Sequence, residues 1–457
     1  MRKLSNDDIL IKNARHIHLI GIGGSGMCPI AELLLSKGYE ISGSDILENA
    51  NTNHLLKLGA KVVIGQCAEN ISGADIVGYS AAVHDDNPEL KAARDSKIPT
   101  FERSKLLGAI TRFYDNTVGV SGTHGKTTVS SMITQILFLN KRDPSAVIGG
   151  KLPLLGSACV SGKSETLICE SCEFVDSFLE FSPEISVLLN IDNDHLDYFK
   201  TMDNLVESFK KFCNKSSLCY FNGDDELCKS AVTGIGAKLI SYGMGENNFY
   251  HPENIRAGKF GFSFDVVRDG NIVGHLDMHV PGKHNIYNGL VSFAVCFDMG
   301  VDAEGINDAL KTFTGAGRRF QFIGEKSGVT VVDDYAHHPT EIYATLSAAK
   351  SLDYKKIIVV FQPFTYSRVA LLKEGMIKAL SIADKVFLTP IVASREENIY
   401  GVSSEDIAKC VPGGKVISDY DQLSSEMAEC AKSGDIIITM GAGDVFKVAP
   451  MILEKLK

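Results

Sequence analysis

Short apolar runs alternate with amphipathic stretches along most of the chain. One apolar run begins at His16, and Ile30, Leu33 and Leu34 then recur at helical spacing. The same alternation returns near the C-terminus, where TVVDDY and KIIVVFQP are separated by the helical stretch EIYATLSAAK. Apolar runs of this length are typical of strands buried on both faces, and intervening helices are typical of parallel sheets. The pattern predicts an α/β fold.

The length of 457 residues is more than one ordinary domain needs. We expect three domains: a Rossmann-like N-terminal domain over residues 1–108, a P-loop ATPase-like central domain over 109–316, and a Rossmann-like C-terminal domain over 317–457. The second boundary is placed at the glycine cluster of GAGRRF.

Composition narrows the class of protein. Hydrophobic residues make up 44% of the chain and charged residues 22%, and no apolar run approaches the roughly 18 residues that a membrane span needs. The first residues, MRKLSNDDILIKN, lack the apolar core of a signal peptide. We therefore expect a cytoplasmic protein without membrane insertion, whose 11 cysteines are reduced thiols. The net charge of −10 argues against binding of nucleic acid, which is itself an anion.

A glycine-bearing turn joins a strand to a helix between Val118 and Ser131, in VGVSGTHGKTTVSS. Backbone N–H groups of such a turn bind phosphate oxygens, a lysine such as Lys126 reaches the outer phosphates, and a hydroxyl such as that of Thr127 holds magnesium. The strict P-loop pattern is not fully met, because Val120 stands where it asks for glycine. The turn predicts a nucleotide-using enzyme; the alternative is a glycine-rich turn that only opens a helix.

A second glycine turn follows the first strand. Gly21, Gly23 and Gly26 form G-x-G-x-x-G, and Asp45 ends the next strand at the distance where Rossmann folds place a ribose-contacting acid. We interpret this turn as a dinucleotide or nucleotide-diphosphate site. The alternative is a tight structural turn.

Acids and a histidine follow two apolar strands of the central domain. Glu170 ends one strand, and Asp194 and His195 follow another. The carboxyl ends of parallel strands meet at the edge where such sheets build their sites. Glu170 can supply a hard oxygen ligand to magnesium and His195 can bind metal, while Lys126 and Arg319 can neutralise charge on a γ-phosphate. The alternatives are a solvated ion pair at His195 and a solvated arginine pair at Arg318 and Arg319.

Eight motifs lie in order along essentially the whole chain. They are GIGGSGM, GTHGKTT, the Glu170 segment, NIDNDHLDYF, PGKHNIYN, GAGRRF, DDYAHHPTE and FQPFTYSR. In kind and in order they resemble those of a known family, the Mur ligases of peptidoglycan synthesis. The resemblance is greatest to the branch that adds L-alanine to UDP-N-acetylmuramate. It implies an ATP-dependent reaction in which the muramoyl carboxylate attacks the γ-phosphate, and the amine of L-alanine converts the resulting acyl phosphate to an amide.

The resemblance also implies the binding residues. Catalytic roles fall to Lys126, Glu170, His195 and Arg319. The magnesium ligands are Thr127, Glu170 and His195. ATP would contact Gly122, Thr123, His124, Gly125, Lys126, Thr127, Thr128, His284, Asn285, Asn288, Arg319 and Asp334. The UDP-sugar would contact Gly21, Gly23, Gly24, Ser25, Gly26 and Asp45. Helix capping is the alternative role for the asparagines.

Tyr335, His337 and Arg368 match family positions near the amino acid, with Arg368 pairing with its carboxylate. Pro339 reads as the first residue of a helix, so the preceding histidines could instead belong to a helix cap. Phe364 and Thr365 depart from the family pattern, which leaves Arg368 alone to bind the carboxylate. The segment IVASREENIYGVS, residues 391–403, is assigned no role.

Three other functions remain open. A recycling ligase that attaches a whole tripeptide to the same UDP-sugar is the nearest. A nicotinamide-dependent oxidoreductase would explain the first glycine turn but not the second, and a nucleotide switch would not need Glu170 and His195. The sequence leaves the oligomeric state unknown.

Overall fold

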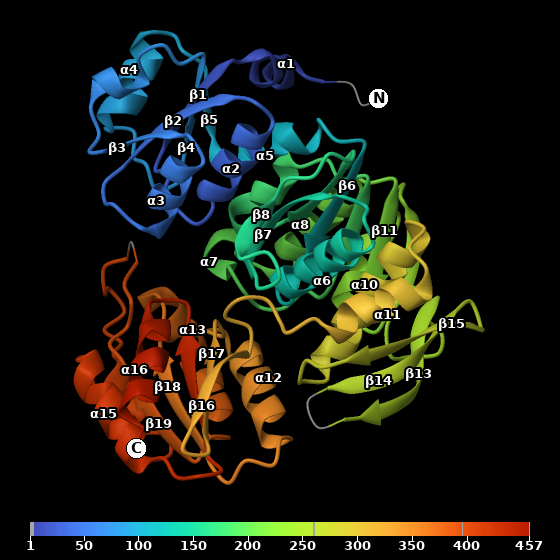
Figure 1. Ribbon diagram of the computed structural model, residues 1–457, viewed down its shortest axis with the longest axis vertical. Helices are drawn as coiled ribbons and strands as arrows, with labels where there is room; N and C mark the ends of the chain where they lie inside the picture. Colours follow the sequence, from blue (N-terminus) through green and yellow to red (C-terminus); the bar gives the residue numbers. More distant parts are fainter. Residues whose placement is uncertain (1–3, 259–260, 395, 457) are drawn as a thin grey trace. The chain divides into compact units, whose positions relative to one another are not determined.

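The computed structural model describes residues 4–258, 261–394 and 396–456. Its strands form sheets of five, ten and six strands, in chain order (Figure 1). Most of the first two sheets belongs to one compact unit, and a second unit takes residues 254–264, 276–287 and 311–457. The prediction of a three-domain α/β fold is confirmed.

The N-terminal sheet is entirely parallel, in the order β3-β2-β1-β4-β5. Its strands are β1 (His16–Ile20), β2 (Glu40–Asp45), β3 (Lys61–Ile64), β4 (Ile76–Tyr79) and β5 (Thr100–Glu102). Its helices are α1 (Asn6–Asn13), α2 (Cys28–Ser36), α3 (Ala50–Lys57), η1 (Ala68–Ile71), α4 (Pro88–Asp95) and α5 (Arg103–Thr111). The strand order reverses at β1, so the loop after β1 lies at a topological switch point.

The central sheet has the order β15-β14-β13-β12-β11-β10-β6-β9-β7-β8. The strands from β12 to β7 in this order pair in parallel, and β8 runs antiparallel to β7. The strands are β6 (Asn116–Ser121), β7 (Ser145–Leu152), β8 (Ser157–Val160), β9 (Thr166–Glu170), β10 (Ile185–Leu188), β11 (Leu218–Asn222), β12 (Lys238–Tyr242), β13 (Tyr250–Ala257), β14 (Phe262–Arg268) and β15 (Asn271–Met278). The helices are α6 (Lys126–Leu139), η2 (Phe174–Glu180), α7 (Leu196–Phe199), α8 (Met202–Cys213), α9 (Glu226–Val232), α10 (His284–Asp298) and α11 (Ala303–Lys311).

The C-terminal sheet has the order β16-β17-β21-β18-β19-β20, and only the edge strand β16 is antiparallel to its neighbour. The strands are β16 (Gln321–Lys326), β17 (Val329–Asp334), β18 (Ile357–Gln362), β19 (Lys385–Leu388), β20 (Lys415–Val416) and β21 (Ile436–Gly441). The helices are α12 (Pro339–Lys350), α13 (Tyr366–Leu380), α14 (Ser404–Ala408), α15 (Tyr420–Cys430), η3 (Val445–Lys447) and α16 (Val448–Lys455).

Strand β21 shows why helices cover both faces of this last sheet. Successive side chains of a strand point to opposite faces. Ile436 and Ile438 belong to a core cluster with residues of α12 and α13, whereas Ile437 belongs to a cluster with residues of α15 and α16. The whole of β21 is buried, so the continuous apolar run in the sequence reflects two cores rather than one.

The cysteines are all free thiols. Cys67 and Cys410 are exposed, Cys172 and Cys430 are partly buried, and the other seven are buried. Burial raises the pKa of the Cys28 thiol to about 11 and that of Cys169 to about 12.

Some elements were not predicted from the sequence. Helix α1 has Ile9 and Leu10 exposed and only Ile11 buried among its apolar residues, so it lacks an apolar stripe. A capping box between Ser5 and Asp8 marks its start instead. Strand β13 carries a proline and exposes its second half, which hides it from a search for apolar runs.

Candidate active site

The phosphate-binding turn predicted between Val118 and Ser131 joins β6 to α6. Gly122 has φ +139° and Gly125 has φ +85°, which side chains other than glycine rarely adopt. Gly125 is the N-cap of α6, so the free N–H groups of the first helical turn, which begins with Lys126, face the turn. The local geometry is that of an anion-binding helix start.

Asn190, just beyond β10, holds this turn in shape. Its Oδ1 accepts the His124 N–H at 2.8 Å, its Nδ2 donates to the His124 carbonyl at 3.0 Å, and its own carbonyl accepts the Thr123 N–H at 3.0 Å. The His124 ring lies 2.9 Å from an Asp192 carboxylate oxygen. Asn190 was not predicted from the sequence, because nothing in a lone asparagine after a strand indicates a partner 66 residues away.

Lys126 is held by three oxygen atoms. Its Nζ donates to the Gly122 and Thr123 carbonyls and to the Glu173 carboxylate, the last at 2.9 Å. The side chain of Lys126 is 12% exposed and that of Glu173 only 2%. Burial acts to lower the pKa of Lys126, but the nearby acidic groups, with Glu173 first among them, together outweigh this effect and the net pKa is raised. Glu173, the charge partner of this lysine, was not predicted from the sequence.

Thr127 and Glu170 meet beside Lys126. The Thr127 hydroxyl donates to Glu170 Oε1 at 3.1 Å, and the Gly149 N–H donates to Glu170 Oε2 at 2.7 Å. Hydroxyl and carboxylate oxygens are the ligands that Mg²⁺ prefers. The structure thus brings together two of the three predicted magnesium ligands, and their chemistry fits the ion.

His195 lies on the loop after β10 and is the N-cap of the short helix α7, in the left-handed conformation at φ +57°. Its ring centroid is 4.8 Å from that of Phe174, and its Nε2 is 3.6 Å from Asp194 Oδ2. A non-glycine residue in this conformation is held by its surroundings and often marks a functional site.

All three predicted adenine-side residues lie on α10. Asn288 lies against the phosphate turn, because a Cβ built on Gly125 would be 3.1 Å from Asn288 Oδ1. Asn285 donates from Nδ2 to the Pro281 carbonyl at 2.7 Å, which is a cap-like bond. His284 begins the helix, and its ring lies close to Gly282.

The N-terminal glycine turn is fastened to Asp45. Asp45 Oδ2 accepts the Gly23 N–H at 2.9 Å, and Gly21 and Ile22 donate to the Ser44 carbonyl. One oxygen of the predicted ribose-contacting acid therefore already supports the turn that includes Gly24 and Ser25. Arg103, at the start of α5, lies beside Gly26, since a Cβ there would be 3.2 Å from Arg103 Cδ. This cation was not predicted.

The two neighbouring arginines of GAGRRF have different environments. Arg318 pairs with Asp333 at 2.9 Å, donates to the carbonyls of Gly441 and Gly443, and lies between the rings of Tyr335 and Phe446. Arg319 lies over the ring of Tyr335, with its guanidinium carbon 5.4 Å from the ring centroid, and its Nη1 is 3.6 Å from Glu341 Oε1. Arg318 therefore joins β17 to the end of β21 and the loop after it within the C-terminal domain. It is not the solvated side chain that the alternative of a solvated arginine pair implied.

Asp334 is a buried carboxylate at the carboxyl end of β17. Its oxygens accept the N–H groups of Phe320 at 2.8 Å and Ala336 at 2.7 Å. Burial raises the pKa of Asp334 to about 6, although Arg319 and the two N–H donors oppose the rise. A carboxyl group that titrates this close to neutrality is typical of a functional site.

The histidines after Tyr335 have separate roles. His338 is the N-cap of α12, with Pro339 at the first helical position, as the alternative reading predicted. His337 Nδ1 lies 3.1 Å from the Tyr335 carbonyl and 3.4 Å from Glu341 Oε2. Arg368 lies in the first turn of α13 and is half-buried.

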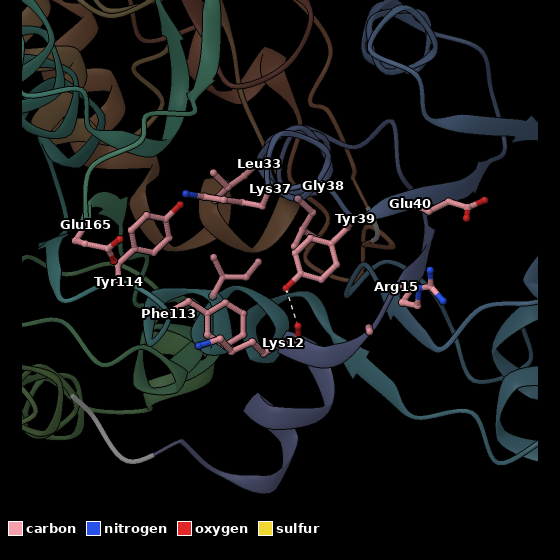
Figure 2. Close-up of a pocket in the computed structure, with 13 residues that line it drawn as sticks. Lys12, Arg15, Leu33, Lys37, Gly38, Tyr39, Glu40, Phe113, Tyr114 and Glu165 are labelled. Atoms are coloured by element: carbon pink, nitrogen blue, oxygen red, sulfur yellow. Dashed lines mark hydrogen bonds between the residues drawn. The ribbon is translucent and has the colours of Figure 1, made fainter.

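A cavity of about 610 Å³ lies away from these residues (Figure 2). Lys12, Arg15, Lys37 and Tyr39 line it, and the Tyr39 hydroxyl donates to the Lys12 carbonyl at 3.3 Å. Arg15 and Tyr39 come just before β1 and β2, whereas the glycine turn follows the carboxyl end of β1. The cavity thus opens at the opposite edge of a parallel sheet from the predicted site.

Among the described residues, none of the helices combines the length and the apolar character that crossing a bilayer requires.

The fold and the phosphate-binding turn define a nucleotide-binding protein built from three α/β domains. Three family models match it: "Mur ligase family, catalytic domain" over residues 16–115, "Mur ligase middle domain" over 120–296, and "Mur ligase, glutamate ligase domain" over 318–443. The chain belongs to the Mur ligase family.

Individual relatives agree with this assignment. A UDP-N-acetylmuramate–L-alanine ligase of Caldanaerobacter subterraneus is 42% identical over 98% of this chain and 100% of its own. The crystal structure of a UDP-N-acetylmuramate–alanine ligase from Thermotoga maritima has a TM-score of 0.82 at 28% identity, covering 96% and 98% of the two chains. A murein peptide ligase from Psychrobacter arcticus has a TM-score of 0.73 at 22% identity over 97% and 98%, and at that identity the likeness concerns the fold.

Proposed function

We propose that this chain is an ATP-dependent ligase that joins L-alanine to the carboxylate of UDP-N-acetylmuramate in the cytoplasm. The observation that carries the proposal is the phosphate turn, where Lys126 donates to Glu173 at 2.9 Å and the adjacent Thr127 donates to Glu170 at 3.1 Å. The identity of 42% to a full-length ligase of this specificity supports the choice of substrates.

Magnesium would be held by Thr127 and Glu170, with His195 as a ligand of a second metal position. Bound there, the ion would neutralise charge on the phosphate oxygens. Lys126 and Arg319 add positive charge for the γ-phosphate. This charge is needed because the attacking carboxylate and the phosphate are both anions and repel each other.

The reaction has two balanced steps. An oxygen of the muramoyl carboxylate forms a bond to the γ-phosphorus, and ADP leaves. The amine nitrogen of L-alanine then bonds to the acyl carbon, phosphate leaves, and the nitrogen loses a proton. Tyr335, His337 and Arg368 would hold the amino acid, with Arg368 on its carboxylate.

The two nucleotides would bind at separate glycine turns. ATP would lie on residues 122–128, with His284, Asn285 and Asn288 on the adenine side and Asp334 at the ribose. The UDP diphosphate would lie on residues 21–26, where Asp45 keeps the Gly23 N–H in place at 2.9 Å. Arg103 supplies a cation beside Gly26.

The domain boundaries we propose are those near residues 108 and 316.

Phosphate release by the purified protein tests the proposal. The assay contains ATP, magnesium and UDP-N-acetylmuramate, with L-alanine, glycine, L-serine or the cell-wall tripeptide in separate reactions. We expect the highest kcat/KM with L-alanine. The kcat/KM for glycine should be lower by roughly 10-fold to 200-fold, because glycine lacks one methyl group.

Two outcomes would change the assignment. Phosphate release supported only by the tripeptide would make the chain a recycling ligase, the nearest of the alternatives that the sequence leaves open. No release with any acceptor would remove the catalytic roles given to Lys126, Glu170 and His195.

A further inference from the structure

Residues 391–394 and 396–402, which we call the 391–402 segment, lie between β19 and α14, and some of them bind to the start of α13. The Val392 N–H donates to the Pro363 carbonyl and the Thr365 N–H donates to the Val392 carbonyl, both at 2.9 Å. Phe364 and Val392 also form an isolated β-bridge. The segment therefore lies alongside the residues that lead from β18 into α13.

Glu396 provides the second attachment. Its Oε2 accepts the backbone N–H of Ser367 at 2.8 Å, and its Oε1 accepts the Ser367 hydroxyl at 2.6 Å. Ser367 lies in the first turn of α13, whose N-cap residue Thr365 makes no side-chain capping bond. A carboxylate at a helix N-terminus satisfies a free N–H and interacts favourably with the helix dipole. Glu396 therefore caps α13 from about 29 residues away along the chain.

The capped turn has an unusual backbone. Thr365 has φ +60° and ψ 140°, a conformation that a threonine keeps only where the surrounding structure holds it. The bond to the Val392 carbonyl acts on Thr365 itself, and the two bonds from Glu396 act two residues later. Arg368 follows Ser367 directly, so these bonds also fix the turn that carries Arg368.

We infer that Glu396 is a positioning residue for Arg368, and through it for the carboxylate of the amino-acid substrate. This inference rests on the proposed function, in which Arg368 binds that carboxylate. The first turn of α13 offers two groups that attract an anion: its free backbone N–H groups and the side chain of Arg368. Glu396 fills the first, which leaves the incoming carboxylate to Arg368 and fixes where along the helix it binds.

Steady-state kinetics of four variants test the inference. Glu396→Gln keeps the shape of the side chain, but its amide can accept only one of the two bonds from Ser367. Ser367→Ala removes the hydroxyl bond and keeps the backbone bond. Glu397→Gln is the matched control, because Glu397 is exposed on the same segment. Arg368→Ala tests the underlying assignment.

We expect Glu396→Gln to raise the KM for L-alanine about tenfold and Ser367→Ala about threefold, while the KM values for ATP and UDP-N-acetylmuramate stay within twofold. Glu397→Gln should match the unmodified protein. If Glu396→Gln behaves as the control does, or if it changes all three KM values together with the melting temperature, the inference is overturned. If Arg368→Ala leaves the KM for L-alanine unchanged, the assignment of Arg368 fails first and takes the inference with it.

Discussion

At the scale of single residues, the phosphate turn depends on a charge pair in which Lys126 Nζ lies 2.9 Å from a carboxylate oxygen of Glu173. Lys126, Thr127 and Glu170 were predicted from motifs and the structure brings them together. Glu173 was missed because it follows Glu170 by three positions and looks like any solvated acid. Only the folded chain shows that its side chain is 2% exposed and pairs with Lys126. Charge pairs of this kind depend on tertiary contacts, which local patterns do not encode.

Replacing Glu173 by glutamine should slow catalysis. Lys126 would keep its two carbonyl partners but lose the charged partner that lies 2.9 Å from its Nζ. We expect kcat to fall about 10-fold to 100-fold, while the KM for ATP stays within about threefold. This fall corresponds to a rise in the activation free energy of order 1.5–3 kcal/mol, the range for a hydrogen bond to a charged group. The control is Glu207→Gln, an exposed residue of α8. Equal kcat values in the two variants would contradict the prediction.

Asp334 gives the site a pH dependence. Its pKa of about 6 means that it gains a proton as the pH falls through that value. If the carboxylate accepts hydrogen bonds from the ribose of ATP, kcat/KM for ATP should decrease below about pH 6, approaching tenfold per pH unit.

Asp334→Asn provides the reference for this profile, because ATP itself also titrates near neutral pH. The variant should be less active throughout and should lose the part of the acid decline that belongs to the carboxyl group. Profiles of identical shape would show that Asp334 does not control the acid limb.

At the scale of elements, buried polar residues join the strands of the N-terminal sheet to its helices. Glu89 of α4 is fully buried, accepts a bond from the Ser44 hydroxyl at 2.6 Å and lies 3.3 Å from His18 Nε2. His18 Nδ1 in turn lies 2.8 Å from the Ser42 hydroxyl. The network fixes α4 against β1 and β2 just below the glycine turn.

Removing one member of this network should lower the free energy of unfolding more than replacing two members together. Glu89→Ala leaves His18 and Ser44 without their partner, and we expect the free energy of unfolding to fall by about 3–5 kcal/mol. The double variant Glu89→Leu with His18→Leu should be less destabilised, which urea unfolding of both proteins would measure. Additive losses would contradict the coupling.

The same network predicts the sign of a pH effect. Burial raises the pKa of Glu89, but bonds from His18, Ser44 and Asn70 outweigh it, and the net pKa is lowered. A carboxyl group with a lowered folded pKa contributes stability above its unfolded pKa, and this stability is lost as the pH falls through the folded value.

The elements themselves were predicted with uneven success. Strands β17 and β18 were predicted because both are apolar runs buried along their whole length. The edge strand β16 and helix α1 were not, because β16 exposes several of its residues and α1 has no apolar stripe. An element that buries little leaves little periodicity in the sequence.

At the scale of the whole molecule, the chain divides into two compact units, and the predicted UDP-sugar turn lies in the first of them. We expect calorimetry to resolve two transitions. UDP-N-acetylmuramate at 100 times its Kd should stabilise the unit that contains residues 21–26 by about 2.7 kcal/mol and leave the other nearly unchanged. A single transition that shifts as a whole would mean that the units unfold cooperatively.

The distribution of the thiols gives this molecule two ready attachment points for spectroscopic probes. Seven of the 11 cysteines are buried, whereas Cys67 in the N-terminal domain and Cys410 in the C-terminal domain are exposed. Thiolates are the reactive form, so the raised pKa values of buried thiols such as Cys28 protect them further. Mild maleimide labelling should therefore place a donor and an acceptor dye on the N-terminal and C-terminal domains of the unmodified sequence, and energy transfer between them would follow the catalytic cycle in real time.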